Sequence, residues 1–175
     1  VLFRSDEMPL FTITSVVDDV EFNVSNILRG DDHITNTAAQ IKLFRYLGSE
    51  VPNFGHFPLM RSKTGSGLSK RFNSFSLDDL RKRKIFPLII LNYLNKIGSN
   101  LSNDEIDDID LLKKNFDLSS FSKNSVLFND SDLERLNSKY LKTLTYQNLK
   151  KFFDFKYDER FWDIIKNNVD GLKEI

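Results

Sequence analysis

The order of apolar and polar residues divides the chain into an α/β part followed by a helical part. Residues 11–17 alternate and are rich in β-branched side chains, which predicts a strand or a passage from strand to helix. Residues 26–29 predict a second short strand. Residues 33–47 carry apolar side chains at helical spacing, and Gly48 ends the pattern. Strand, polar turn and amphipathic helix in this order are typical of an open parallel sheet.

The turn between the second strand and the helix combines Gly30 with two carboxylates, Asp31 and Asp32. Either aspartate can cap the helix, in which Ile34, Ala38 and Ile41 keep the helical period. Open parallel sheets bind ligands beyond the carboxyl ends of their strands, so Arg29, Asp31 and Asp32 are predicted to lie at a site. The alternative for Arg29 is a surface arginine that pairs with one of the aspartates.

The helical part contains several start signals. Ser76 is expected to cap a short basic helix over residues 77–84, and Pro87 to begin a helix that ends at Gly98. The apolar face of this second helix consists of four residues at helical spacing: Leu88, Leu91, Leu94 and Ile97.

Two capping boxes, Ser102-x-x-Glu105 and Ser131-x-x-Glu134, predict further helix starts. The last helices are expected over residues 146–153 and 158–168. The pattern therefore predicts a piece of an α/β sheet followed by an all-helical region, with the boundary near residues 72–80.

A short loop at residues 63–71 contains two glycines, two serines and a final Lys-Arg pair. Glycine lets the backbone come close to a ligand, while lysine and arginine suit phosphate oxygens. The loop lacks the spacing of a P-loop. Taken alone, it is either a polyphosphate-binding loop or a solvated basic hairpin.

Composition limits the class of protein. The chain has 175 residues, of which 40% are hydrophobic and 29% charged, as is usual for a soluble globular protein of one or two domains. No signal peptide is visible or expected, and no apolar run approaches the ~20 residues that span a bilayer. The chain has no cysteine, and His33 and His56 are isolated, so no zinc or other metal site is expected. We expect a cytoplasmic location without a membrane.

The formal net charge is zero, but the charges are unevenly distributed. Residues 61–84 carry eight basic and two acidic side chains, whereas residues 101–120 carry six acidic and two basic ones. This asymmetry fits a polyanion that approaches from one side. Two oppositely charged solvated faces would give the same pattern.

The end of the loop, GLSKR at residues 67–71, resembles the KMSKS signature of class I aminoacyl-tRNA synthetases in its KLSKR form. Other segments follow the order found in that family: RSD (4–6), SVVDD (15–19), LRGDDHITNTAAQIKLFRYLG (28–48), HFPL (56–59), LNYLNKIG (91–98) and LERLNSKYL (133–141). The chain resembles bacterial glutamyl-tRNA synthetases firmly up to residue 141 and weakly beyond it.

The resemblance implies the C-terminal half of a class I Rossmann-type catalytic domain, followed by a helical stem-contact domain. Residues 1–76 would form this half with its KMSKS-like loop, residues 77–144 the stem-contact domain, and residues 145–175 the start of an anticodon-binding domain. Nothing in the chain matches the HIGH sequence of the family. We therefore expect a fragment that lacks the HIGH-containing N-terminal half and most of the anticodon-binding domain.

The resemblance also implies a reaction, in which glutamate is activated with ATP and transferred to tRNA. Lys70 would be catalytic, because it would stabilise charge on the phosphates. The residues implied for ATP binding are Asp32, Leu59, Met60, Gly67, Leu68, Ser69, Lys70 and Arg71. Gly67 replaces the first lysine of KLSKR, which removes a cation. ATP is expected as a substrate, with Mg²⁺ bound to it.

Three residues are implied for glutamate: Arg29 would pair with a carboxylate through two hydrogen bonds, Phe11 stands in place of a tyrosine, and Ser15 is polar. Four residues would contact tRNA phosphates, which position the tRNA without reading its sequence: Arg81, Lys82, Arg83 and Lys84. The partners implied are glutamate and tRNA(Glu), with tRNA(Gln) left open, and the protein is expected to be a monomer.

On its own, the chain is expected to show no glutamate-dependent ATP–pyrophosphate exchange. Three alternatives remain: a non-catalytic tRNA- or nucleotide-binding module derived from a synthetase, a relative of the glutamyl-queuosine transferases, and a helical protein without a nucleotide site. The helices predicted after residue 145 argue against the second, because that relative lacks the anticodon domain.

Overall fold

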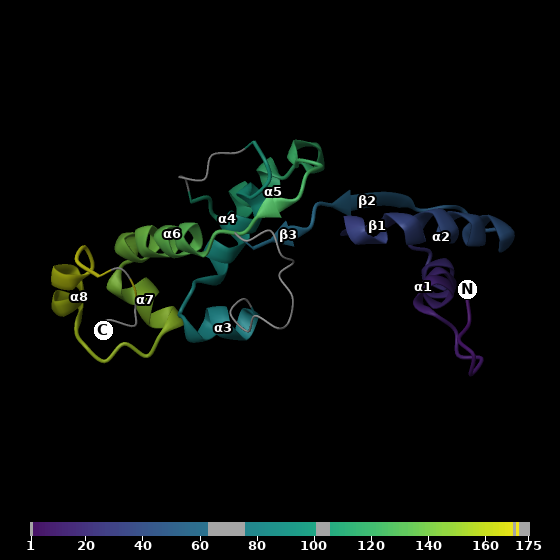
Figure 1. Cartoon of the computed structure of the whole chain (residues 1–175). Helices are drawn as coiled ribbons and strands as arrows, with labels where there is room; N and C mark the ends of the chain where they lie inside the picture. Colours follow the sequence, from purple (N-terminus) through teal and green to yellow (C-terminus); the bar gives the residue numbers. More distant parts are fainter. Residues whose placement is uncertain (1, 63–75, 101–105, 170, 172–175) are drawn as a thin grey trace. The chain divides into compact units, whose positions relative to one another are not determined.

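The computed structural model describes residues 2–62, 76–100, 106–169 and 171. The chain forms two compact units, which we call unit 1 (Val1–Leu59) and unit 2 (Met60–Ile175). Unit 1 contains a parallel strand pair with helices, and unit 2 consists mainly of helices (Figure 1). The predicted order of an α/β part and a helical part is confirmed.

Unit 1 is built around two parallel strands, β1 (Asn26–Gly30) and β2 (Asn53–Phe57). The chain passes from one to the other through the 3₁₀ turn η1 (Asp31–His33) and helix α2 (Ile34–Tyr46). The predicted βα unit is therefore present. Residues 53–57 carried no strand prediction.

Residues 11–17 do not form a strand but belong to helix α1 (Phe11–Glu21), so the strand prediction is wrong. The hydroxyl of Ser15 donates to the carbonyl of Phe11 at 2.7 Å, a bond that a helix accommodates along its own backbone. Val16 is fully buried. Packing against α2 thus outweighs the strand preference of the β-branched residues.

Helix α2 ends as predicted, since Gly48 has a positive φ of 70°. Its start and its buried face differ from the prediction. Neither aspartate caps the helix, because both lie in η1, and the N-cap residue His33 makes no side-chain cap. The buried residues are Thr37, Gln40 and Phe44, whereas Ile34 is 55% exposed. A polar face therefore points into the unit.

Unit 2 begins with β3 (Met60–Arg61), which pairs in parallel with β4 (Val126–Leu127). Its described helices are α3 (Leu77–Lys82), α4 (Pro87–Lys96), α5 (Ile109–Asn115), η2 (Leu118–Ser120), α6 (Asp130–Thr143), α7 (Tyr146–Phe152) and α8 (Glu159–Ile165). The predicted starts of α3 and α4 are confirmed: the Ser76 side chain accepts from the Asp79 backbone N–H at 3.1 Å, and Pro87 is the first residue of α4.

Two predictions about unit 2 are wrong. Leu91 and Leu94 are 44% and 40% exposed, and α4 instead buries Ile89, Asn92, Tyr93 and Lys96. The Ser131 capping box fails because α6 already begins at Asp130, with Asn129 as its N-cap residue. The box at residues 102–105 lies outside the described residues.

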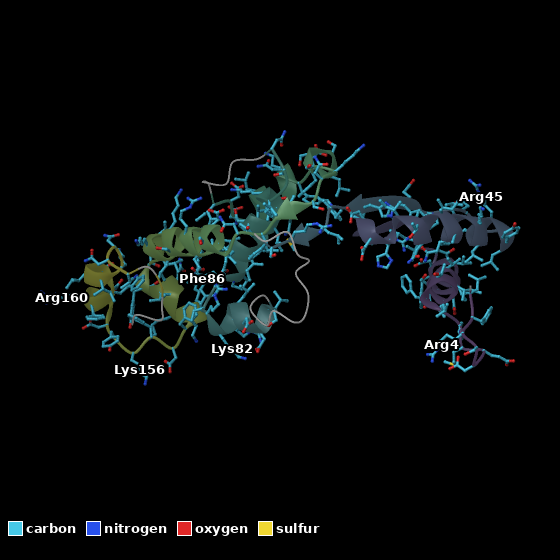
Figure 2. All side chains as sticks on the ribbon, viewed as in Figure 1. Arg4, Arg45, Lys82, Phe86, Lys156 and Arg160 are labelled. Carbon is cyan, nitrogen blue, oxygen red and sulfur yellow. The ribbon has the colours of Figure 1, made fainter. Side chains whose placement is uncertain are left out.

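The core of unit 2 is rich in aromatic residues. Phe86, labelled in Figure 2, is 1% exposed and makes edge contacts with the rings of Tyr140, Phe152 and Phe153 at centroid distances of 5.1–5.3 Å. No helix within the described ranges has the length and apolar composition needed to cross a membrane.

Candidate functional site

The strongest concentration of polar contacts in unit 1 lies near the carboxyl ends of β1 and β2. Arg29, the residue before the last of β1, stands opposite His56 of β2 in the strand register. Parallel strands end at the same edge of a sheet, where side chains from both can meet one ligand. The predicted location of Arg29 is thus observed.

The guanidinium of Arg29 is held by helix α2. Its Nη2 donates to Thr37 Oγ1 at 2.6 Å and to Gln40 Oε1 at 2.5 Å, and its Cζ lies 5.2 Å from the ring centroid of Phe54. Arg29 is therefore not the surface arginine of the alternative interpretation, since its hydrogen bonds go to α2 rather than to Asp31 or Asp32.

The same helix connects Arg29 to Ser15. Gln40 Nε2 donates to Ser15 Oγ at 2.6 Å, and Ser15 Oγ donates to the carbonyl of Phe11 at 2.7 Å. The ring of Phe11 meets that of His33 edge-on, with centroids 5.6 Å apart. The three residues predicted to bind glutamate, Phe11, Ser15 and Arg29, are thus linked within unit 1.

A second branch runs from Arg29 to His56. Thr37 Oγ1 donates to the carbonyl of His33 at 3.1 Å and lies 2.8 Å from His56 Nε2. The tautomer of His56 decides which of the two groups donates in this contact. Sequence reasoning missed Thr37 and Gln40, since polar residues on an amphipathic helix are normally placed at its solvent face.

Burial is the largest cause of the pKa shifts of two charged residues, Arg29 and Asp19. It lowers the pKa of Arg29, and Asp19 opposes that shift by attraction. Burial also raises the pKa of Asp19, which Arg29 lowers and Asp18 raises further. Arg29 remains protonated at neutral pH. Arg29 and Asp19 thus attract each other while burial disfavours the charge on both.

A count of donors shows what Arg29 can offer. Both hydrogens of Nη2 are used by Thr37 and Gln40, and Nε is buried without a hydrogen-bond partner. Nη1 is neither buried in this way nor bonded to a described residue. Nη1, with its two hydrogens, is therefore the nitrogen that can donate to an outside acceptor.

A second group of predicted residues gathers after the end of β1. A Cβ on Gly30 would lie 2.5 Å from Asp32 Oδ1 and 3.4 Å from Leu59 Cδ2. Two of the residues predicted for ATP, Asp32 and Leu59, therefore both lie against Gly30. Met60, another of them, belongs to β3 of unit 2 and is 37% exposed. The remaining ones lie outside the described residues: Gly67, Leu68, Ser69, Lys70 and Arg71.

The four cations predicted for tRNA phosphates have different surroundings. Arg83 pairs with Asp130 at 2.8 Å and Glu134 at 2.7 Å. Burial lowers the pKa of Arg83, but the hydrogen bonds to both carboxylates outweigh burial and raise it. Lys82, which extends from α3 in Figure 2, pairs with Asp78 at 2.7 Å. Arg81 and Lys84 are exposed, and Lys84 Nζ lies 5.5 Å from the ring centroid of Phe153.

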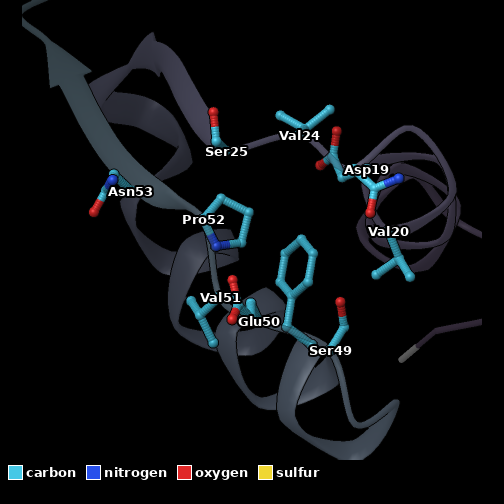
Figure 3. A pocket seen from close by; sticks show the side chains of 11 residues that line it. Asp19, Val20, Val24, Ser25, Ser49, Glu50, Val51, Pro52 and Asn53 are labelled. Atoms are coloured by element: carbon cyan, nitrogen blue, oxygen red, sulfur yellow. The ribbon is translucent and has the colours of Figure 1, made fainter.

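A pocket of about 250 Å³ lies at the opposite edge of the sheet, where β1 and β2 begin (Figure 3). Its walls include Phe44 and Pro52 and the carboxylates Asp19 and Glu50. Among the described residues, no group of three or more histidine, aspartate or glutamate side chains is placed to hold a metal ion.

Comparisons with known proteins identify the family. A family model described as tRNA synthetases class I (E and Q), catalytic domain, matches residues 1–135. Glutamate–tRNA ligase 2 of Granulibacter bethesdensis is 37% identical over 174 residues, which cover 99% of this chain and 39% of the relative. Glutamate–tRNA ligase 1 of Chelativorans sp. is 36% identical over 179 residues, with the same shares covered. The chain thus spans 39% of the length of these relatives.

Solved structures show the same fold. The glutamate-tRNA synthetase of Elizabethkingia anophelis matches with a TM-score of 0.83 and 22% identity, over 99% of this chain and 41% of that one. A glutamate tRNA ligase of Elizabethkingia meningosepticum, solved in complex with its amino acid, gives a TM-score of 0.81. With most of its length inside the family model, the chain belongs to the class I tRNA synthetases of the E and Q group.

Proposed function

We propose that this chain is part of a glutamate–tRNA ligase, which activates glutamate with ATP and transfers it to tRNA(Glu) in the cytoplasm. The observation that carries the proposal is the setting of Arg29. This cation lies near the carboxyl end of a parallel strand, is fixed by α2 through Nη2, and makes no hydrogen bond through Nη1 to a described residue. The relatives that cover the chain are named glutamate–tRNA ligases.

In this proposal Arg29 binds a carboxylate of glutamate through Nη1. The partly buried cation gains more from an anion than an exposed one would, since water screens the pair less. Ser15 already gives its hydrogen to the carbonyl of Phe11, so its free lone pair suits a donor such as an ammonium group. The ring of Phe11, which is 54% exposed, would cover the ligand.

The nucleotide would lie beside Gly30, against Asp32 and Leu59. Met60 and residues 67–71 are the other residues that the family resemblance implies for ATP. Lys70 would stabilise the charge that develops on the phosphates, by the electrostatic effect that dominates phosphoryl chemistry. Mg²⁺ would enter with the phosphates of ATP, and we assign no protein ligand to it.

The assignment of domains is part of the same proposal: residues 1–76 to the catalytic domain, 77–144 to the stem-contact domain and 145–175 to the start of the anticodon-binding domain. Arg81 and Lys84 are the cations best suited to tRNA phosphates, since Arg83 is already engaged by α6. Charging of tRNA(Gln) as well as tRNA(Glu) is the second possibility within this function.

The test is glutamate binding to the 175-residue chain, measured by NMR titration and calorimetry, with Arg29→Lys as the main variant. Lysine keeps the charge but loses the bonds to both Thr37 and Gln40. We expect binding of glutamate to be at least about tenfold weaker in this variant, as for a lost hydrogen bond to a charged group. Equal binding of glutamate by both proteins, or shifts that avoid Phe11, Ser15 and Arg29, would refute the proposed site.

A second assay separates the ligase from a non-catalytic module. The chain is combined with a separate polypeptide that carries a HIGH-containing half of a related ligase, and glutamate-dependent ATP–pyrophosphate exchange is measured. We expect exchange in the mixture and none in the chain alone. Tight nucleotide binding without glutamate binding and without exchange in the mixture would favour the non-catalytic module.

A further inference from the structure

We infer that Gln40 is a positioning residue, which decides which atoms of Arg29 and Ser15 face the substrate. The inference rests on the proposed function and adds a residue that neither the motifs nor the pattern singled out. Gln40 is 1% exposed on α2, yet both ends of its amide are bonded. Its Oε1 accepts from Arg29 Nη2 at 2.5 Å, and its Nε2 donates to Ser15 Oγ at 2.6 Å.

The chemistry of the two neighbours fixes the direction of this amide. Arg29 has only donors, so it requires the oxygen end of Gln40. With its own hydrogen directed to the carbonyl of Phe11, Ser15 requires the nitrogen end. The primary amide of Gln40 supplies both, an acceptor through its oxygen and a donor through its nitrogen, without a charge.

The two hydrogen bonds of Gln40 decide which donor of Arg29 and which acceptor of Ser15 remain free for a ligand. Because Gln40 and Thr37 take the two hydrogens of Nη2, Arg29 presents Nη1. Because Gln40 donates to Ser15, the serine oxygen keeps one lone pair and no free hydrogen. The amide of Gln40 thus lies between a donor, Arg29 Nη1, and an acceptor, Ser15 Oγ. This pair suits a ligand that carries both a carboxylate and an ammonium group.

The structure offers two informative substitutions. Gln40→Met keeps the length and removes both hydrogen bonds. Gln40→Glu keeps an acceptor for Arg29 but cannot donate to Ser15, so it separates the two contacts. The matched controls are Gln147→Met and Gln147→Glu, because Gln147 is exposed on α7 in unit 2.

The first readout is the side-chain NMR spectrum of Arg29 in the ligand-free chain, which does not depend on any activity. In the wild type, we expect separate Nη resonances with slow exchange, because two bonds restrain the guanidinium. Gln40→Met should merge these resonances, Gln40→Glu should retain them, and the Gln147 variants should leave them unchanged. Unchanged Arg29 resonances in folded Gln40→Met would overturn the inference.

The second readout is the affinity for glutamate. We expect a loss of about tenfold or more in Gln40→Met, since its lost contacts include one to a charged group. We expect a smaller loss in Gln40→Glu, where Arg29 stays in place. Wild-type affinity in Gln40→Met would overturn the inference even if the resonances merge. If Gln40→Met fails to fold, Gln40→Glu decides, since unchanged glutamate affinity and unchanged Ser15 signals would then count against a positioning role.

Glutamate binding and the positioning role of Gln40 are tested separately by these two readouts. Absence of glutamate binding by the wild type would refute the proposed function, while restrained Arg29 resonances that depend on Gln40 would still establish the contact. Glutamate binding with no dependence on Gln40 would leave the proposed function standing and refute the inference.

Discussion

At the scale of single residues, the most informative position is Gly30. Its backbone angles are ordinary for any residue, with φ −66° and ψ 152°, so conformational freedom is not its contribution. Its contribution is the missing Cβ, which leaves room for the carboxylate of Asp32 and the side chain of Leu59 at the end of β1.

Gly30→Ala tests this explanation. The added Cβ would lie 2.5 Å from Asp32 Oδ1, so the carboxylate must move. Because Asp32 is exposed and can move into solvent, we expect the free energy of unfolding to change by less than about 0.5 kcal/mol. Nucleotide affinity should fall by several-fold in a calorimetric titration.

The control is Gly171→Ala, since no atom of the described residues lies within 4 Å of a Cβ built at Gly171. Nucleotide affinity should be the same in this control and in the wild type. Unaltered nucleotide affinity in Gly30→Ala would mean that Asp32 does not contact ATP.

The pKa of Asp19 gives a prediction on pH. Burial raises this pKa above the unfolded value of 3.8, so the folded state binds more protons between the unfolded and the folded pKa. Stability from this group is therefore present below pH 3.8 and lost as pH rises through the folded pKa. Asp19→Asn should abolish this loss, so that the variant gains stability relative to the wild type as pH rises.

The measurement is denaturant unfolding followed by NMR signals of unit 1 at several pH values. Asp18→Asn is the control, because it removes one carboxylate from an exposed position next to Asp19. If the free energies of unfolding of the wild type and Asp19→Asn differed by the same amount at every pH, the raised pKa of Asp19 would not be the cause.

The sequence located part of the site and missed another part for a physical reason. Arg29, Asp32 and Ser15 were predicted from a strand end, an acidic turn and a family resemblance. Thr37 and Gln40 were not, because their polarity indicates a solvated helix face unless an inward partner is known. Their partner is the guanidinium of Arg29 at the end of β1. This contact forms only in the folded unit, so the spacing of residues along α2 does not predict it.

At the scale of elements, local signals predicted boundaries better than faces. Ser76, Pro87 and Gly48 mark helix ends through their own backbone chemistry, and these predictions are confirmed. The buried faces of α2 and α4 were predicted wrongly, since each buries polar residues that find specific partners. A prediction from periodicity uses only the spacing of apolar residues. It therefore assigns polar residues to the solvent face, even where a buried amide has hydrogen-bond partners.

Asn92 of α4 is an example of such a polar side chain, because it is fully buried and hydrogen-bonded. Its Nδ2 donates to the carbonyl of Asp107 at 2.8 Å, and its Oδ1 accepts from the N–H of Asp107 at 2.8 Å. The side chain thus pairs with one backbone residue as a neighbouring strand would. It connects α4 to the segment that precedes α5.

We expect Asn92→Leu to lower the free energy of unfolding by about 2 kcal/mol or more, because two backbone groups of Asp107 lose their partner. Chemical denaturation followed by circular dichroism measures this change. Asn167→Leu, at an exposed position, should remain within about 0.5 kcal/mol of the wild type. A mild effect at Asn92 would show that water replaces the amide.

At the scale of the whole molecule, the uneven charge distribution gives a prediction on tRNA binding. Arg81→Gln and Lys84→Gln should each weaken binding of tRNA to the chain and reduce the slope of log affinity against log salt by about 1. Salt titrations with fluorescently labelled tRNA measure both quantities.

Arg45→Gln provides the charge-matched control, since Arg45 is an exposed residue of α2 in unit 1 (Figure 2). A slope that changes equally in all three variants would show that net charge alone, rather than a defined surface on α3 and the residues after it, controls the association.

The chain has one tryptophan, Trp162, and it is fully buried in unit 2. Its indole N–H donates to the carbonyl of Leu144 at 2.9 Å, and its ring meets Phe155 edge-on at 5.6 Å. Fluorescence excited at the red edge of the absorption band therefore comes from one place, between the end of α6 and α8. The protein therefore carries an intrinsic optical reporter of that junction, which needs no label.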